Sequence, residues 1–291
     1  MSLSINEIKA KIVSTENMSK ITKAMQMISA AKLTKSEAKL KTHQTYVQTL
    51  EEIMRKTVEA KLVEEHIFFQ PNAKTSCRAY LVVSSDRGLA GGYNNKVLKV
   101  LQQEIGQRGK EEYKLYLVGK KAFDYARRAK LVVENDYLYI PDDMIYPDIE
   151  PVVNKVVADY AMGMISEVVI LYHDYLSKLI QEPAMKRILP LKRELVDPFL
   201  SSNYLFNPNK DEMVQTLLLR YLNGSIYETV LKAKLAEHAS RMNAMQNATD
   251  NATDIIKESQ LIYNRARQAT ITQEINEIIG GAVALKKKVN V

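Results

Sequence analysis

INEIKAKIVSTENMSKITKAMQMI, residues 5–28, is the stretch that decides the fold. It belongs to a longer segment, from Ser4 to about Lys61, that contains neither proline nor glycine. A second such segment, from Lys210 to Ile279, contains no proline and only one glycine. As α-helices the two segments would span roughly 85 Å and 105 Å. Because a single domain of this size is only about 40 Å across, each helix needs a partner along its length, and we expect the two to pair antiparallel.

Apolar residues of the first segment recur at steps of three and four. This spacing is typical of the narrow seam of a coiled coil rather than of the broad apolar face of a core helix. The steps slip in phase after Ile12, which predicts a short or loosely wound pair of helices and not a long unbroken heptad. The residues expected on the seam are Ile5, Ile8, Ile12, Met18, Ile21, Met25, Ile28, Val47, Leu50, Met54 and Val58.

The second segment shows the same spacing. Its expected seam residues are Val214, Leu217, Tyr221, Leu231, Leu235, Met242, Met245, Ile271, Ile275, Ile278, Ala282 and Leu285. We expect the last run, from Ile271 onward, to hold the two helices together. Between the runs lies a tandem repeat, residues 247–250 and 251–254, which stacks Ala248 over Ala252 and leaves two aspartates facing water.

Between the two long segments, short apolar strands alternate with helices. This order predicts a central Rossmann-like α/β domain with a mainly parallel sheet, and therefore an α/β fold with a long coiled coil. The domain boundaries we expect are 1–66 for the N-terminal helix, 67–207 for the α/β domain and 208–291 for the C-terminal helix. The expected strands are 79–83, 114–118, 131–133, 167–172 and an antiparallel edge strand at 185–191; the expected helices are 120–128 and about 149–164.

The chain is basic, with a formal net charge of +7. Such an excess indicates an anionic partner, which could be nucleic acid, a lipid surface or an acidic protein. Part of it lies in the first segment, where lysines outnumber glutamates, and part at residues 286–288. Spread lysines can equally be a solvated helix face. The lysines concerned are Lys9, Lys11, Lys20, Lys23, Lys32, Lys35, Lys39 and Lys41.

Cys77 is the only cysteine, so no disulfide can form within the chain and we expect a reducing compartment. The first residues, MSLSINEIKAKI, lack the apolar run of a signal peptide and contain an early acidic residue, unlike a transit peptide. No run approaches the length of a membrane span. These features predict a protein on the cytosolic side of a membrane.

The glycine-containing segment from Ser85 to Asn94 follows a strand and opens a helix, which is where dinucleotide folds bind phosphate. Its glycine spacing is not G-x-G-x-x-G, and the chain has no P-loop. We therefore expect a turn with a local structural role. The histidines show no metal-ligand spacing, and no pair of acids stands out in a loop that could form a cleft. The sequence predicts neither an enzyme nor a cofactor or metal site.

Three motifs, in order, resemble those of the γ subunits of ATP synthase, and the resemblance covers the whole chain. The first is Ile21–Met25 followed by Ala30–Lys32; the second is the segment from Ser85 to Asn94. The third is the C-terminal run from Ile271 to Ala284, with Thr272, Glu274, Glu277, Gly281 and Ala282 at the family's spacing. Without a transit peptide, the chain is most similar to the bacterial type.

This resemblance implies a central rotor shaft that couples ion flow through a membrane ring of c subunits to the catalytic β subunits. Its partners would be the α and β subunits, the ε subunit and the c ring, with no nucleic acid and no nucleotide bound directly. It would lie at the cytoplasmic face of the bacterial cell membrane as a peripheral protein. The residues implied in contacts with the head are Lys23, Met25, Arg267, Gln268, Thr272 and Glu274; those implied in contacts of the foot are Tyr204 and Phe206.

Two other classes of function compete with this one. A nucleic-acid-binding protein with a basic coiled-coil arm on an α/β body would fit the charge, but the chain has no tryptophan for stacking and no RNA-binding motif. A nucleotide-dependent enzyme would need glycines at a different spacing. Titration with nucleotide and with single-stranded RNA separates these classes from a rotor shaft.

Overall fold

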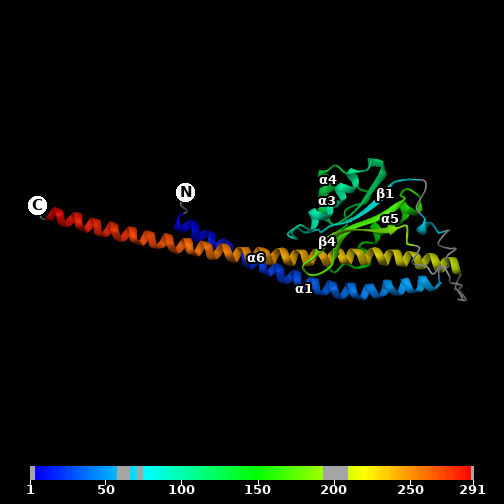
Figure 1. The fold of residues 1–291 in the computed structure, drawn as a ribbon, viewed down its shortest axis with the longest axis horizontal. Coiled ribbons are helices and arrows are strands. Elements are labelled where there is room, and N and C mark those ends of the chain that lie inside the picture. The colour runs from blue at the N-terminus through cyan, green and yellow to red at the C-terminus, as the bar shows by residue number, and fades with distance from the viewer. Residues whose placement is uncertain (1–3, 58–65, 71–74, 193–208, 290–291) are drawn as a thin grey trace. The chain divides into compact units, whose positions relative to one another are not determined.

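The structure is a computed structural model, and it describes residues 4–57, 66–70, 75–192 and 209–289. Two compact units account for these residues. One, which we call the body, comprises residues 28–243. The other, which we call the two-helix unit, contains the residues up to Met27 and those from Ala244 onward. Both long helices contribute to both units, and Figure 1 labels the elements of the chain. The helices and strands are α1 (Ile5–Thr57), β1 (Arg78–Val83), α3 (Tyr93–Gly106), β2 (Tyr113–Val118), α4 (Lys120–Arg128), α5 (Glu150–Ala161), β3 (Glu167–Tyr175), β4 (Gln181–Leu189) and α6 (Lys210–Val289), with short 3-10 helices at Ile67–Phe69, Lys110–Glu112 and Tyr146–Asp148.

The body contains one four-stranded sheet in the order β2-β1-β3-β4. Strand β1 pairs in parallel with both of its neighbours, and β4 pairs antiparallel with β3 at the edge. The predicted mainly parallel sheet and its antiparallel edge strand are therefore confirmed. The edge strand spans residues 181–189, so it begins and ends earlier than the predicted 185–191.

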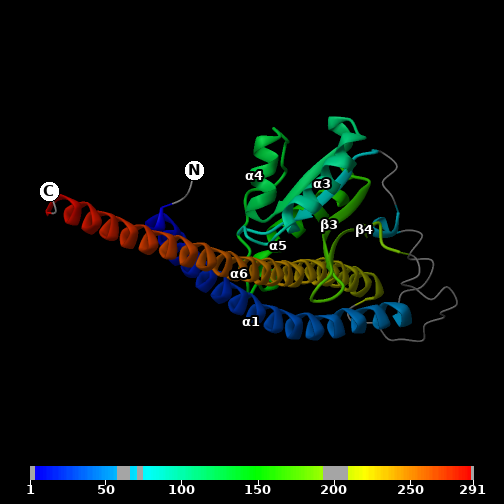
Figure 2. The ribbon, with the colours of Figure 1, turned by 60° about the vertical axis from the view of Figure 1, so that its left-hand side comes forward.

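Side chains of the strands alternate between two faces of the sheet, as the pleat requires. One face is covered by α3 and α4, which Figure 2 shows together on that side. The other face is covered by α5 and by the long helices, and it holds the larger core. Tyr80 and Val82 point to the first face, whereas Leu81 and Val83 point to the second. The body thus has three layers.

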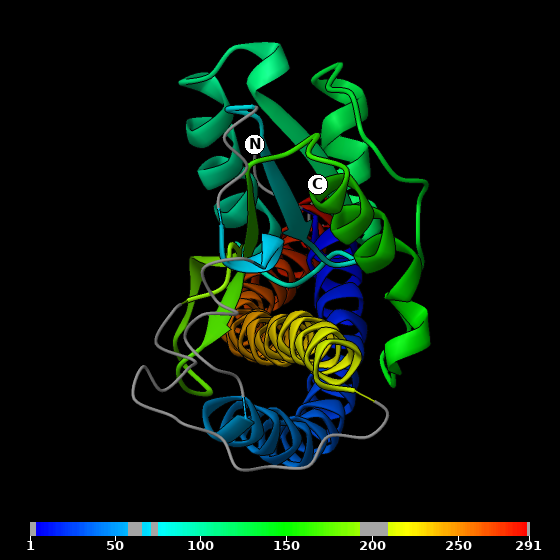
Figure 3. The same ribbon diagram turned by 90° about the vertical axis from the view of Figure 1, so that its right-hand side faces the viewer.

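The first part of α6 lies between the sheet and the C-terminal part of α1, as Figure 3 shows. From Val214 to Arg241 the helix is therefore buried on most of its circumference, with Leu218 and Leu222 completely inaccessible. Helix α1 lies outside α6 and buries only one stripe. The helices run antiparallel, since Tyr221 donates a hydrogen bond to Glu51 (3.0 Å) while His43 bonds the carbonyl oxygen of Gly224 (2.9 Å).

The stripe that α1 buries corrects the predicted phase slip. The buried and half-buried positions continue at alternating steps of three and four without interruption, so the seam of α1 is one unbroken heptad pattern. Three of the predicted seam residues, Met18, Ile21 and Ile28, are instead 55–57% exposed. The seam residues are Ile5, Ile8, Ile12, Thr15, Ser19, Thr22, Gln26, Ser29, Leu33, Ser36, Leu40, His43, Val47, Leu50 and Met54. Polar residues occupy its middle, which is why apolar spacing alone suggested a slip.

The predicted strand at 131–133 is wrong. This segment follows the edge of β2 but makes a single backbone hydrogen bond to it, from the Glu134 nitrogen to the Leu115 oxygen (2.8 Å). The side chain of Asn135 then bonds both backbone groups of Leu117 (2.8 and 2.9 Å), in place of a further strand. The apolar residues there, Leu131 and Val133, pack against the core under α3 and α4.

Helix α5 ends at Ala161, before the predicted Met164. The reason is Gly163, which adopts a φ of 77° that closes the last turn. The remaining predictions for the middle of the chain are close to the observed bounds: strand 79–83 lies within β1, 114–118 within β2, helix 120–128 is α4, and strand 167–172 lies within β3.

Candidate contact surface

The two-helix unit buries small and polar side chains where its helices meet. On α6 the half-buried and buried positions again follow steps of four and three: Met245, Thr249, Ala252, Ile256, Ser259, Tyr263 and Ala266. Across the pair, the hydroxyl groups of Thr22 and Thr249 lie 2.7 Å apart. One turn on, Gln26 donates a hydrogen bond from Nε2 to Oε1 of Gln246. As the tandem repeat predicted, Ala252 is buried, and both aspartates of the repeat are exposed.

The outer surface of the same unit is unusually apolar. Large apolar side chains are between 40% and 71% exposed on both helices, namely Val13, Met18, Ile21, Met27, Ile255, Leu261, Ile262, Ile271, Ile275, Ile278 and Ile279. A helix pair usually buries its apolar residues and exposes its polar ones. Here Ile8 and Met245 are buried between the helices, but many other large apolar residues face outward, and every residue of α6 from 267 to 280 is exposed. An extended apolar surface among lysines is typical of a site that a partner protein covers. We call this outer surface the contact surface.

The exposed Ile271, Ile275 and Ile278 also correct a prediction. These residues were expected to hold the two helices together, but in the structure they are 46%, 50% and 71% exposed. The seam of α6 instead follows the residues from Met245 to Ala266. The isoleucines therefore belong to the contact surface.

The structure places the predicted head-contact residues in the two-helix unit. Lys23 is exposed and Met25 is half-buried on α1. Arg267, Gln268 and Glu274 on α6 are exposed, as is Thr272, whose hydroxyl group donates a hydrogen bond to the backbone oxygen of Gln268 (2.9 Å).

These residues do not form a single cluster. Thr249 faces Thr22, and Arg267 lies about five helical turns further along α6, roughly 27 Å away. The structure therefore separates the predicted residues into one group on α1 and another on α6. The two predicted foot residues, Tyr204 and Phe206, lie outside the described residues.

The segment from Ser85 to Asn94 has the local structural role that its glycine spacing predicted. Asn94 caps the turn, since its Oδ1 accepts a hydrogen bond from the Ser85 nitrogen (3.0 Å). Asp86 accepts bonds from the Lys120 nitrogen and from the hydroxyl group of Tyr137, both at 2.9 Å. The polar groups of this segment are thus engaged within the body.

The same segment also anchors the body to α6. Tyr93 donates a hydrogen bond to the backbone oxygen of Ala233 (2.9 Å). From the other side, Arg241 donates to the backbone oxygens of Gly88 (3.3 Å) and Arg87 (3.4 Å). This contact joins the carboxyl end of β1 to the long helix.

Sequence reasoning missed a buried ion cluster on α6. Glu237 is 2% exposed and lies between Lys234 (3.3 Å) and Arg241 (2.7 Å). Burial would raise the pKa of the Glu237 carboxyl group, but the two cations lower it overall. The spacing K-x-x-E-x-x-x-R, which places all three residues on one helix face, was the available signal. The cluster fixes the guanidinium group that holds the segment at Arg87 and Gly88.

Part of the basic excess on α1 serves the body instead of facing solvent. Lys32 forms an ion pair with Asp142 at 2.5 Å, and Lys39 donates to the backbone oxygens of Asp143 and Met144. Burial would raise the pKa of Asp142, but the hydrogen bond from Lys32 and nearby cations lower it overall. The exposed lysines of α1 are Lys9, Lys11, Lys20, Lys23, Lys35, Lys41 and Lys56.

Within the described ranges, no group of histidine, cysteine, aspartate and glutamate side chains has the arrangement of a metal site. A search over those ranges also finds no helix with an apolar run long enough to cross a membrane.

A helix pair that meets partly through polar residues and exposes many apolar ones, in a chain whose α/β body engages its glycine segment internally, is typical of a subunit that works by contact with partners. Comparison with known proteins identifies the family within this class. The family model described as ATP synthase matches residues 4–285. The ATP synthase gamma chain of Staphylococcus carnosus is 40% identical over 289 residues, which cover 97% of this chain and 99% of that one.

Solved structures share the fold. A chain of the Euglena gracilis mitochondrial ATP synthase, in a structure of its OSCP, F1 and c-ring, has a TM-score of 0.71 at 20% identity and covers 99% of this chain and 96% of its own. A chain from the central stalk and c-ring of the Tetrahymena thermophila enzyme has a TM-score of 0.60 at 22% identity, over 78% of this chain and 99% of its own.

The chain belongs to the ATP synthase gamma family. It is a non-catalytic rotor subunit of the central stalk, and the comparisons give no support to a nucleic-acid-binding function.

Proposed function

We propose that this chain couples rotation of a ring of c subunits to the catalytic head through contacts of the two-helix unit with the α and β subunits. The observation that carries the proposal is the apolar outer surface of that unit: its helices meet partly through threonine and glutamine side chains, while isoleucine and methionine side chains lie exposed on the outside. The structural relatives come from assemblies described as containing F1 and a c-ring.

In this proposal the predicted residues divide their roles by position. Lys23 and Met25 on α1 face a loop of the β subunit near the lower mouth of the head. Arg267, Gln268, Thr272 and Glu274 on α6 meet the β subunit's contact loop. Tyr204 and Phe206 contact the ε subunit and the c ring.

The physical basis of coupling is asymmetry. A pair of helices has no three-fold symmetry, so its contact surface meets three chemically identical β subunits differently. A shaft can change the nucleotide affinity of a β subunit only by as much as its contacts differ between that subunit's conformations. Arg267, Ile271, Glu274 and Ile278 share one face of α6, so charged and apolar groups on that face would provide such differences.

The proposed location is the cytoplasmic face of a bacterial cell membrane, where the chain would be a peripheral member of the complex. Its attachment would come from the c ring and the ε subunit.

The test is to replace Gln268 by Leu and Thr272 by Val together, in a complex reconstituted with α, β and the membrane sector. Both side chains are exposed and lie one turn apart, so their loss should leave the helix folded. Losing two hydrogen bonds to the head should cost about 1–3 kcal/mol of interaction. We expect reduced ATP-driven proton pumping or poor assembly, with unchanged helical circular dichroism of the isolated chain.

Thr270→Val is the matched control, because Thr270 is exposed on the same turn but on another side of α6. Normal pumping and assembly by the double variant would show that Gln268 and Thr272 are solvated surface and not contact residues.

A further inference from the structure

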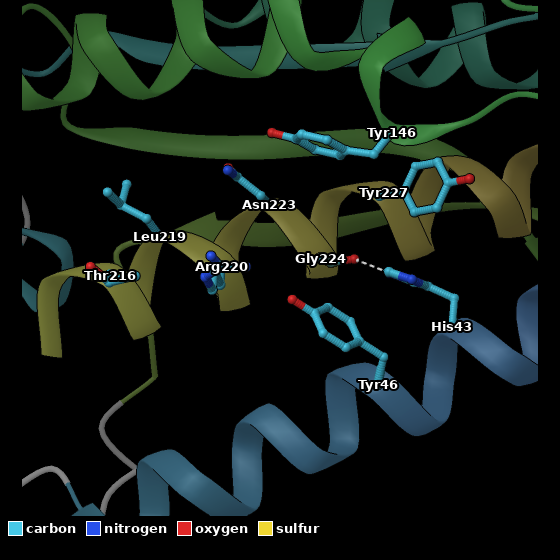
Figure 4. A pocket seen from close by; sticks show the side chains of 9 residues that line it. All are labelled: His43, Tyr46, Tyr146, Thr216, Leu219, Arg220, Asn223, Gly224 and Tyr227. Carbon is cyan, nitrogen blue, oxygen red and sulfur yellow. Dashed lines mark hydrogen bonds between the residues drawn. The ribbon is translucent and has the colours of Figure 1, made fainter. Parts of the chain in front are cut away.

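The body contains a pocket that the rotor function does not use. Its volume is about 490 Å³, and it lies between α1, the first turns of α6 and the 3-10 helix Tyr146–Asp148. Figure 4 shows the side chains around it, with Tyr46 reaching in from α1 and Tyr146 from the opposite wall. The lining residues are His43, Tyr46, Tyr146, Thr216, Leu219, Arg220, Asn223, Gly224 and Tyr227.

Some polar groups of the pocket are already engaged. Tyr227 donates its hydroxyl hydrogen to the Met144 oxygen (2.9 Å), and His43 bonds the Gly224 oxygen (2.9 Å). The ring of Tyr227 also meets that of His43 edge to face, with centroids 4.8 Å apart. These bonds fix the two rings as rigid aromatic walls.

Other polar groups of the pocket are available. The hydroxyl oxygen of Tyr146 is shielded from water and has no hydrogen-bond partner among the described residues. Burial raises the pKa of Tyr146 to about 12, so this group is a hydrogen-bond donor at neutral pH. An unsatisfied buried donor of this kind costs about 1–3 kcal/mol unless something accepts its hydrogen.

The charge of the lining favours an anion. Arg220 is exposed and forms no ion pair within the described part of the chain. Asn223 lies three residues further along α6, and its amide group adds two hydrogen-bond donors to the lining. The lining contains no aspartate or glutamate. A guanidinium group is the side chain best suited to carboxylate or sulfonate groups, and the tyrosine rings suit a flat apolar body.

We propose that this pocket binds a small aromatic monoanion, a molecule of one to three rings bearing a single carboxylate or sulfonate group. The rings would lie against Tyr46 and Tyr227. The anionic group would accept hydrogen bonds from Arg220 and, after the shielded hydroxyl group of Tyr146 turns into the pocket, from Tyr146. Pockets of this size are large enough for such molecules. Because α1 and α6 both line the pocket, binding would also stabilise the body against unfolding.

The test is fluorescence titration of the full chain with 8-anilinonaphthalene-1-sulfonate, an aromatic sulfonate that brightens in apolar pockets. The comparison probe is N-phenyl-1-naphthylamine, which has the same rings and no charge. We expect saturable binding of the sulfonate at one site. Arg220→Met should weaken it about tenfold, as a charged hydrogen bond predicts, and leave the neutral probe unchanged. Tyr146→Phe should weaken the sulfonate about threefold to tenfold.

A second variant separates this pocket from other apolar surfaces that bind such dyes. Thr216→Trp places a large ring in the pocket and should abolish the saturable site. Gln215→Trp is its matched control, because Gln215 is exposed on the same turn but does not line the pocket. Circular dichroism checks that both variants fold, and if Thr216→Trp does not, the Arg220→Met comparison decides alone.

Three results would overturn the proposal: sulfonate binding that does not saturate, sulfonate binding that Arg220→Met leaves intact, or equal loss of the charged and neutral probes in that variant.

Discussion

Helices α1 and α6 pair in both units, but the chemistry between them differs. In the body, the seam of α1 presents Leu33, Leu40, Val47, Leu50 and Met54, all buried in one core with residues of α6 and the sheet. In the two-helix unit, the same seam presents Ile5, Ile8 and Ile12 at its start and then a polar run of Thr15, Ser19, Thr22 and Gln26. The heptad phase is shared, whereas the forces that hold the helices together are not.

The same heptad repeat therefore serves two purposes, strong helix pairing in the body and weaker pairing in the two-helix unit. An apolar seam gains about 25 cal/mol for each Å² removed from water, so it resists separation. A seam joined by neutral hydrogen bonds gains only about 0.5–1.5 kcal/mol per bond, because water offers the separated groups equivalent bonds. The body half therefore anchors the helices. The two-helix unit has a polar run in its seam and exposes many of its large apolar residues on the contact surface.

The largest effect should come from the buried ion cluster in the body. Glu237→Gln leaves the charges of Lys234 and Arg241 without their counter-ion, which should lower the free energy of unfolding by about 3–5 kcal/mol. Urea denaturation of the body measures this. Glu258→Gln, at an exposed site in the two-helix unit, is the control and should change stability by less than about 0.5 kcal/mol. A loss below about 1 kcal/mol for Glu237→Gln would contradict the role given to the cluster.

A pair of alanine substitutions compares the two seams directly. Leu33→Ala removes a side chain that is 2% exposed and should cost about 2–4 kcal/mol, because a cavity remains in the core. Thr22→Ala should cost only about 1 kcal/mol, the worth of its hydrogen bond to Thr249. Hydrogen exchange of backbone amides near each site reports both losses. Equal losses would show that the two seams do not differ in strength.

The pH dependence of the body should depend on His173. Its ring stacks on Tyr93 (4.3 Å between centroids), both of its nitrogens lack partners among the described residues, and burial, with a contribution from Lys96, lowers its pKa to about 4. The unfolded state, with a pKa of about 6.5, therefore binds more protons between these values, so stability falls as the pH falls through that window.

His173→Phe keeps a ring on Tyr93 and removes the titrating group. Between pH 7 and pH 5 the variant should lose about 2 kcal/mol less stability than the unmodified chain. The remaining loss includes His238, whose pKa burial also lowers to about 4 beside Glu237 and Asp142. Urea titrations at both pH values measure the free energy of unfolding. Equal losses of stability in the two proteins would rule out His173 as a source of the pH dependence.

The smallest expected effect comes from a double variant that makes the seam of the two-helix unit more apolar, like the seam of the body. Gln26→Leu with Gln246→Leu replaces the hydrogen-bonded pair of the two-helix unit by an apolar pair, and should strengthen helix pairing there by about 1 kcal/mol. Amide exchange of the surrounding residues should slow about fivefold, the factor that corresponds to this free energy. Either single substitution breaks the hydrogen bond between the two glutamines without making an apolar pair, and serves as the control. Faster exchange in the double variant would mean that the glutamine pair is worth more than apolar packing.

The candidate site could be predicted in part. Motif resemblance located Lys23, Met25, Arg267, Gln268, Thr272 and Glu274, and the structure places them on the two-helix unit, whereas their roles stay predictions. The buried ion cluster and the pocket were not predicted. Glu237 and Arg241 resemble solvated residues in sequence, and only the approach of the segment at Gly88 makes them buried.

By itself, the sequence determined the long helices, the alternation of strands and helices that makes a mainly parallel sheet, and the family. Helix length follows from the absence of proline and glycine, and strands follow from short apolar runs, so both depend on local spacing. The tertiary structure alone decided which side of α1 is buried in the polar run of its seam, whereas apolar spacing predicted the buried Ile8, Val47, Leu50 and Met54. Met18 and Ile21 have the spacing of a seam yet are exposed, while Thr22 and Gln26 face the partner helix. The reason is that burial depends on what lies opposite a residue, and Thr249 and Gln246, which lie far away in the chain, provide the hydrogen bonds that make a polar seam possible.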